Sequence, residues 1–269
     1  MKNIINGFGF EYSMFQTLAS ILSATYEHDK QFIKNEECYR QLSDELKEKF
    51  RKSSLLATNY LVKHEKAYVD GCKISMNNDC AGINGDVRDI CIENAPGISL
   101  KNSNNSIRHT RVSKTLNNRL NLDTNHNFEN KIENIFESMS CKVGTKWEPT
   151  EQRQFVAKIT DCVFENFNKT DLTKMIPITL GLIGSNGYYK VNRENNHVVI
   201  DDMRIEKLEF PENVLKIDKI GFNTIRLDMD CGYSFNFRIH TASSRVEKSA
   251  KIDVVQNGLP PSINRVVVS

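Results

Sequence analysis

Apolar residues recur at helical spacing through the N-terminal two thirds of the chain. In residues 8–25 they share one stripe, which predicts a first helix. Residues 36–68 are rich in Glu, Lys, Leu and Ala and contain no Gly or Pro, so they predict one long helix or two shorter ones. Further helices are predicted at 128–139, from Pro149–Thr150 onward, and from Thr170 to just before Pro177.

The period changes from helical to alternating near residue 180. Tyr188–Val191 and His197–Ile200 flank Asn195–Asn196, which is a hairpin signal. Two further alternating runs, ending at Met229 and Ile239, are separated by a turn at Cys231–Gly232. Ile252–Val255 is predicted to be the last strand, followed by a poorly ordered tail. The change of period predicts at most a subdomain seam within a single domain, residues 1–269. The seam divides a helix-rich segment, residues 1–178, from a β-rich segment, residues 179–269.

Composition excludes several classes of protein. The chain is 39% hydrophobic and 26% charged with a net charge of +2, which is ordinary for a globular protein and not a polycation. Seven cysteines without a C-x-x-C pair argue against a zinc site or a disulfide framework. There is no membrane-spanning apolar run and no signal-peptide pattern, so we expect a cytoplasmic protein without a membrane partner.

One stretch carries candidate chemistry. Asp86 and Asp89 precede the apolar run Ile90–Ile92, Pro96–Gly97 predicts a turn, and a second apolar run leads to Lys101. The pattern predicts two strands of one hairpin, with Ser99 and Lys101 on the same face of the second. Carboxylates can hold Mg²⁺ (magnesium), and a nearby lysine can stabilise the transition state, as phosphodiester hydrolysis requires. A surface hairpin with ordinary solvated charges explains the spacing equally well.

Glu11 is a second unusual acid, because it shares the apolar stripe of the first predicted helix. It is either a buried acid close to functional chemistry or an acid in the first helical turn, favoured there by the helix dipole.

Several runs resemble a known family. They are GFGFEY at 7–12, GDVRDI at 85–90, GISLKNSNNSIRHTRVS at 97–113 and FNFRIHTASSRVEKSAKIDV at 235–254. In this order they are similar to the HaeIII-like type II restriction endonucleases, within the PD-(D/E)XK nuclease superfamily. The resemblance implies an α/β (α+β) fold: a central mixed sheet flanked by helices, with a C-terminal antiparallel β-rich region.

The resemblance also implies roles for particular residues. Asp89 matches the first metal ligand, Asp86 the same acidic run, Lys101 the catalytic lysine, and Glu11 a helical acid near the metal. Ser99 stands where the acid of the acid-x-Lys triplet is usual. Glu11, Asp86 or Glu93 would then complete a Mg²⁺ site.

The implied activity is Mg²⁺-dependent cleavage of double-stranded DNA at a short palindrome, GGCC by resemblance. A palindrome suits a two-fold homodimer or a monomer that nicks twice. Two other hypotheses stay open: a sequence-specific DNA-binding protein with a weakened nuclease centre, and a structure-specific repair nuclease of the same superfamily. The helix-rich segment would be catalytic, and the β-rich segment would recognise DNA.

Candidate DNA contacts fall into two groups. Beside the acid-and-lysine stretch are Asn102, Asn104, Arg108, His109 and Arg111. In the β-rich segment, alternation places Arg226, Asn236, Arg238 and His240 opposite the apolar face, with Arg245 and Lys248 in the following loop. The alternative for the second group is a solvated sheet face.

Overall fold

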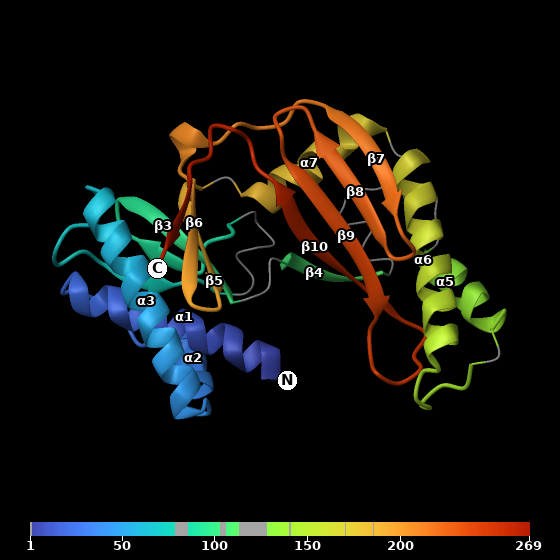
Figure 1. Ribbon diagram of the computed structural model, residues 1–269, viewed down its shortest axis with the longest axis horizontal. Coiled ribbons are helices and arrows are strands. Elements are labelled where there is room, and N and C mark those ends of the chain that lie inside the picture. Colours follow the sequence, from blue (N-terminus) through green and yellow to red (C-terminus); the bar gives the residue numbers. More distant parts are fainter. Residues whose placement is uncertain are drawn as a thin grey trace. The chain divides into compact units, whose positions relative to one another are not determined.

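The computed structural model describes residues 2–78, 86–102, 106–112, 128–139, 141–169, 171–184 and 186–269. The chain forms two compact units (Figure 1). Unit 1 comprises residues 1–105, 183–208 and 262–269, and unit 2 comprises residues 106–182 and 209–261.

Unit 1 is built on a mixed six-stranded sheet with the order β1-β2-β3-β5-β6-β11. Its strands are β1 (Ile74–Met76), β2 (Ile90–Ile92), β3 (Ala95–Asn102), β5 (Tyr188–Glu194), β6 (His197–Met203) and β11 (Arg265–Val268). β3 and β5 pair in parallel, and the other neighbours pair antiparallel. A parallel pair needs a crossover connection, and the described part of the crossover here contains a strand, β4 (Ser106–Val112), and three helices of unit 2.

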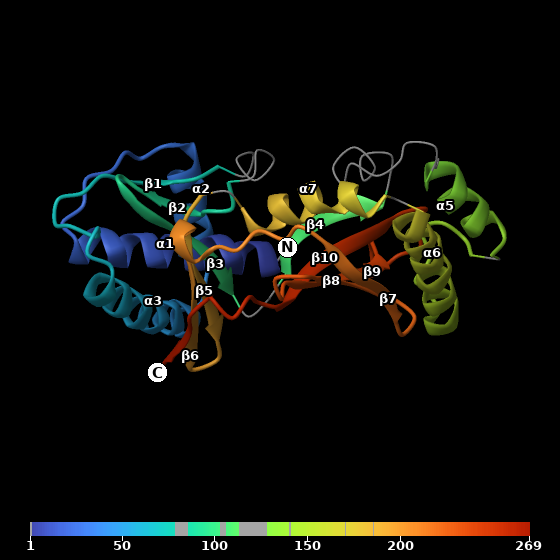
Figure 2. The same ribbon diagram turned by 90° about the horizontal axis from the view of Figure 1, so that it is seen from above.

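Three helices belong to unit 1: α1 (Lys2–Ile21), α2 (Lys30–Arg40) and α3 (Asp44–His64). Figure 2 shows α1 running beside β3, with α3 next to it. Phe15 and Leu18 of α1 and Leu61 of α3 are fully buried, in one core with Ile98 and Val191 of the sheet. One face of the sheet is therefore apolar and covered by helices, and alternate residues of each strand point to the other face.

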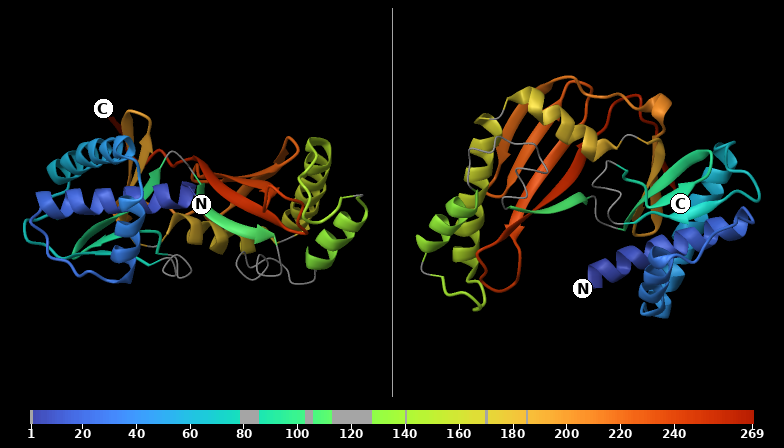
Figure 3. Two further views of the ribbon diagram at one scale, coloured as in Figure 1. Left: turned by 90° about the horizontal axis from the view of Figure 1, so that it is seen from below. Right: turned by 180° about the vertical axis from the view of Figure 1, so that it is seen from behind.

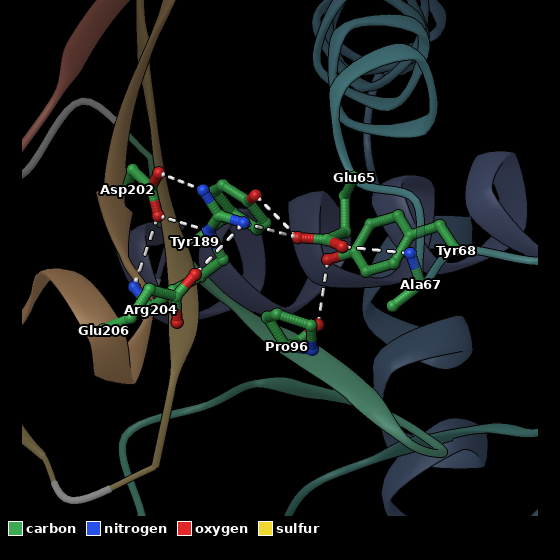
Figure 4. Close-up of polar contacts among 8 residues, drawn as sticks. All are labelled: Glu65, Ala67, Tyr68, Pro96, Tyr189, Asp202, Arg204 and Glu206. Carbon is green, nitrogen blue, oxygen red and sulfur yellow. Dashed lines mark hydrogen bonds and ion pairs between the residues drawn. The ribbon is translucent and has the colours of Figure 1, made fainter.

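A buried polar cluster ties α3 to β5 and β6 (Figure 4). The Glu65 carboxylate accepts hydrogen bonds from the hydroxyl of Tyr189 at 2.9 Å and from Arg204 at 3.2 Å. Arg204 also forms a two-bond ion pair with Asp202. Burial first, and then the bond to Glu65, raise the pKa of the Tyr189 hydroxyl far above its ordinary value. The cluster fixes the strand β5 that lies beside β3.

Unit 2 holds a five-stranded antiparallel sheet with the order β4-β10-β9-β8-β7. Its elements are β4 (Ser106–Val112), α5 (Phe128–Glu137), α6 (Pro149–Lys169), α7 (Leu172–Ile183, whose last residue is assigned to unit 1), β7 (Val214–Ile220), β8 (Thr224–Met229), β9 (Ser234–Thr241) and β10 (Ala250–Gly258). A 3₁₀ turn, η2 (Ile205–Lys207), follows β6 in unit 1. α6 packs on one face of the five-stranded sheet, where Phe167 meets Phe237 edge-on at 5.1 Å between ring centroids.

Several sequence predictions are confirmed. β5 and β6 form the predicted hairpin, and Asn195 has a φ of +47° in its turn. β8 and β9 are the two predicted alternating runs, and Gly232 in the turn between them has a φ of +96°. The 36–68 segment is two helices, α2 and α3, separated near Leu42.

Others are wrong. The turn between β2 and β3 is at Glu93–Asn94, where Asn94 takes a φ of +57°, and Pro96–Gly97 lie inside β3. α7 continues through Pro177. The predicted cap Thr170 lies outside the described residues. The tail, expected to be poorly ordered, forms β11 against β6, and the segment from Ser106 is strand β4.

The division into units also differs from the expected boundary at 178/179. The β5–β6 hairpin joins unit 1, because β5 pairs with β3, and β4 joins unit 2, because it pairs with β10. Strand alternation alone does not tell which sheet a strand enters.

Candidate active site

The carboxylate of Asp89 is fixed to the strand that carries Lys101. The Asp89 N–H donates to the Ile98 carbonyl at 2.8 Å, and one carboxylate oxygen accepts from the backbone N–H of Leu100. The same oxygen lies 3.4 Å from the Ser99 hydroxyl, which donates to it. Asp89 thus lies at the open end of the β2–β3 hairpin, with its side chain in the place of a strand carbonyl. Ser99 is buried at 3% exposure, and Lys101 is half-buried.

Asp86 is directed to a different partner. Its two oxygens accept from the guanidinium of Arg88 at 2.8 and 2.7 Å. Burial opposes ionisation of Asp86, but the hydrogen bonds from Arg88 outweigh it and lower the pKa of Asp86. The Arg88 side chain lies over Gly97, where a Cβ atom would clash with the Arg88 Cδ and come within 2.7 Å of the Ile90 carbonyl oxygen. Glycine at this position therefore lets Arg88 lie flat on β3.

The two remaining candidate acids lie apart from one another. Glu11 accepts from the side-chain amide of Asn35 at 2.9 Å, and Asn35, only 1% exposed, also contacts the Met76 sulfur at 3.4 Å. This chain of contacts leads from α1 to β1, whose Met76 pairs with Ile90, the residue after Asp89. Glu93 is exposed in the hairpin turn, at the opposite end of β2 from Asp89.

Lys190 is a charged residue of this region that the sequence reasoning missed. It is Cα partner to Ser99 in the parallel pair, and its side chain is only 6% exposed. Its signal in the sequence is a lysine inside the otherwise apolar run Tyr188–Val191. Burial first, with a smaller contribution from Lys101, lowers the pKa of Lys190 to about 8, although Asp201 opposes the shift.

The predicted DNA-contacting residues next to Lys101 do not share one environment. Asn102 accepts a hydrogen bond from Arg193 at 3.0 Å and donates to the Asn6 carbonyl at 3.4 Å. Asn104 lies outside the described residues, and so do the side chains of Arg108 and His109, whose backbone belongs to β4. Arg111 is exposed and donates to the Ser249 hydroxyl at 3.2 Å.

The second group of predicted contacts shares one face of the unit 2 sheet. Phe235, Phe237 and Ile239 of β9 are fully buried, so the alternate residues Asn236, Arg238 and His240 point to the opposite face. Arg226 of β8 is Cα partner to Asn236 and therefore lies on that face too. The orange and red strands of Figure 3 show β7 to β10 side by side, which makes this face continuous.

Two of the basic side chains on this face, Arg226 and His240, lie next to carboxylates. Asp228 accepts from Arg226 at 2.8 Å. Burial opposes ionisation of Asp228, but the neighbouring Ser234 side chain and the Arg226 guanidinium outweigh it and lower the pKa of Asp228. His240 lies 3.0 Å from Asp253. In the neighbouring loop, Arg245 donates to the Gly144 carbonyl and Lys248 pairs with Glu133 at 2.9 Å.

Comparison with known proteins identifies the family. The profile of the HaeIII restriction endonuclease family matches residues 7–203 and 191–260. The chain belongs to the HaeIII restriction endonuclease family. It is 25% identical to the type II restriction enzyme HaeIII of Haemophilus aegyptius, across 97% of this chain and 96% of that enzyme. No solved structure matches it.

Members of the type II class generally use a divalent metal ion. In the described residues of the chain, His, Cys, Asp and Glu side chains form no group of three or more that could hold one. Mg²⁺, however, usually keeps several waters and binds through one or two carboxylates together with substrate phosphates. A single rigid carboxylate with a lysine nearby therefore fits a Mg²⁺ ion that DNA helps to hold. Among the described helices, no candidate for a membrane span is found.

Proposed function

We propose that this protein is a type II restriction endonuclease, a site-specific deoxyribonuclease that hydrolyses both strands of duplex DNA at a short palindrome. One observation carries the proposal: the Asp89 carboxylate is hydrogen-bonded onto β3 at Ser99 and Leu100, directly before Lys101. A carboxylate and a lysine on one rigid frame are what phosphodiester hydrolysis needs.

We further propose that unit 1 is a PD-(D/E)XK core. The arrangement in its favour is the helices α1 to α3, then the antiparallel strands β1, β2 and β3, a crossover, and β5 parallel to β3. Asp89 and Lys101 belong to the antiparallel hairpin, and Lys190 to the returning strand.

In this proposal Asp89 holds Mg²⁺, and Glu11 is the acid best suited to assist it. Asp86 is less suited, since Arg88 already takes both of its oxygens, and Glu93 lies at the wrong end of β2. When bound, Mg²⁺ would polarise the phosphoryl oxygen and favour deprotonation of a water. Lys101 orients that water or stabilises the charge that builds on the phosphate. The water oxygen bonds to phosphorus, the bond to the leaving sugar oxygen breaks, and that oxygen takes up a proton.

For recognition we propose the face of the unit 2 sheet that carries Arg226, Asn236, Arg238 and His240. Arg226 and Arg238 can each form two hydrogen bonds to guanine, Asn236 can bond adenine, and the loop cations Arg245 and Lys248 suit phosphates. The proposed target is GGCC, and a two-fold dimer on such a palindrome is the proposed assembly, with a monomer that nicks twice as the alternative.

Purified protein incubated with plasmid DNA and Mg²⁺ tests the proposal. Discrete bands that disappear after GGCC methylation are expected. Two other hypotheses give different results. A sequence-dependent mobility shift without cutting would indicate a DNA-binding protein whose centre is weakened by Ser99. Cutting of branched or flapped DNA alone would indicate a structure-specific nuclease. A methyltransferase encoded beside the gene would agree with a restriction-modification system.

A further inference from the structure

Four charged or polar residues form a row across the unit 1 sheet, one on each of four adjacent strands. Their Cα registers match in turn, β3 to β5, β5 to β6 and β6 to β11. The row is Ser99, Lys190, Asp201 and Arg265. Leu100 follows Ser99, Val191 follows Lys190 and Ile200 precedes Asp201, and all three are core residues. Because successive strand residues point to opposite faces, the row lies on the face opposite the helix-covered core.

The charges of the row are arranged around Asp201, which is only 2% exposed. Arg265 donates to its two oxygens at 2.6 and 3.0 Å, as a two-bond ion pair. The Lys190 ammonium lies farther away, at 4.0 Å from the same carboxylate. Asp201 is thus shared between two cations, and Arg265 has the better geometry.

Lys101 belongs to the same face as the row, because it lies two residues after Ser99 in β3. Its ammonium is among the charges that lower the pKa of Lys190, which means that the two lysines repel each other. An acid at position 99 would stand next to Lys190 in register and offset this repulsion. Ser99 cannot do so, since it has no charge.

We infer that Lys190 is a positioning residue of the nuclease site, a buried cation beside Ser99 that directs Lys101 toward the scissile phosphate. Repulsion from a fixed positive charge on the neighbouring strand, in register with the residue two before Lys101, favours positions of the Lys101 ammonium that point away from the sheet. The negative charge that develops on the phosphate relieves that repulsion, so the effect is largest in the transition state. The inference rests on the proposed function.

A buried lysine that served only the fold would behave differently. Replacing Lys190 by methionine leaves Asp201 its two-bond ion pair with Arg265 and removes a cation whose burial is unfavourable, so the fold should not lose stability. Loss of cutting without loss of stability would therefore separate a functional lysine from a structural one.

The test compares wild type with K190M, K190R and a control, K47M, a lysine of α3 that pairs with Asp44. Three quantities are measured: the first-order rate of plasmid cleavage at saturating protein and Mg²⁺, the Kd for the same DNA by mobility shift without metal, and the melting temperature. For K190M we expect a rate about 10²-fold lower, as on loss of a single transition-state contact. Its Kd should stay within about threefold and its melting temperature should not fall. K190R should recover part of the rate, and K47M should equal wild type.

Wild-type cutting by K190M would overturn the inference, as would a Kd weakened as much as the rate, or unfolding of K190M. A folded K190R that cuts no better than K190M would also contradict it; if K190R does not fold, K190M decides alone. Failure of wild type to cut any DNA would instead overturn the proposed function, and this inference with it.

Discussion

At the scale of single residues, the site depends on how a carboxylate is held. Asp89 accepts hydrogen bonds from the strand beside it, at Leu100 and Ser99, and so has little freedom to move. A rigid ligand loses little conformational entropy when it binds a metal ion or orients a water. In the PD-(D/E)XK core that we propose, Ser99 contributes a hydroxyl donor where a carboxylate is usual, so the proposed site carries less negative charge.

The titration of Lys190 gives a test that does not depend on activity. Its pKa in the folded protein is lowered from 10.5 to about 8. Below pH 8 it is charged in both states, and the native state bears the full cost of the buried charge. As the pH rises from 8 toward 10.5, the native state loses the proton first and the cost is relieved.

Lys190→Met should therefore be more stable than wild type at pH 7, by up to the order of 3 kcal/mol. The difference should shrink as the pH rises from 8 to above 10, as measured by urea unfolding of the two proteins. A difference that is constant over this range would contradict the assignment. The charges that face Lys190 are Asp201, Lys101 and Arg265.

At the scale of elements, the sequence predicts where the strands lie in the chain better than it predicts which strands pair in a sheet. Alternation locates β5, β6, β8 and β9, and Asn195 and Gly232 mark their turns. It does not show that β5 pairs with β3, since that contact depends on a crossover of many residues. The tail is a similar case: the short run Arg265–Val268 becomes a strand only because β6 offers it an edge.

The sequence likewise predicts the candidate site residues that are close together in the chain, but not those that strand pairing brings together. Asp89 and Lys101 stand out because they flank apolar runs close together in the chain. Asp201, Arg265 and Lys190 do not, because only the pairing of β5, β6 and β11 brings them to the same row as Ser99. The misplaced turn has a local reason: Pro96–Gly97 is a common turn pair, but here Gly97 makes room for Arg88.

A substitution in the buried polar cluster around Glu65 tests whether that cluster holds β5 in place. Glu65→Ala removes the acceptor for Tyr189, Arg204 and the Ala67 N–H, and should cost about 2–4 kcal/mol of stability. The matched control is Glu206→Ala, since Glu206 pairs with the same Arg204 but its side chain is 59% exposed; this should cost less than about 1 kcal/mol. Urea midpoints compare them, and equal effects would contradict the structural role of Glu65.

At the scale of the whole molecule, we assign cutting to unit 1 and sequence reading to unit 2. Two separable kinds of defect should follow. A change in the row of unit 1 should slow cleavage of every site equally. A change on the polar face of the unit 2 sheet, which carries Arg226 and Arg238, should alter the choice of site.

Arg238→Ala, on the exposed face of β9, is expected to weaken discrimination against a single changed base pair by about 1–3 kcal/mol. Competition mobility shifts with matched and mismatched duplexes measure it. Lys219→Ala is the control, since Lys219 is Cα partner to the buried Ile225 and so lies on the opposite face of the sheet, where it pairs with Asp161. Equal binding of matched and mismatched DNA by wild type, or unchanged discrimination in Arg238→Ala, would remove this face from recognition.

The most direct test of the proposed nuclease centre concerns Asp89 and Lys101. Asp89→Ala and Lys101→Ala are assayed for Mg²⁺-dependent cleavage of plasmid DNA and, in the same preparations, for binding of the uncut duplex. We predict that both variants lose cleavage by at least about 10²-fold while they bind DNA as wild type does. Full cleavage by both variants would contradict the assignment of the centre.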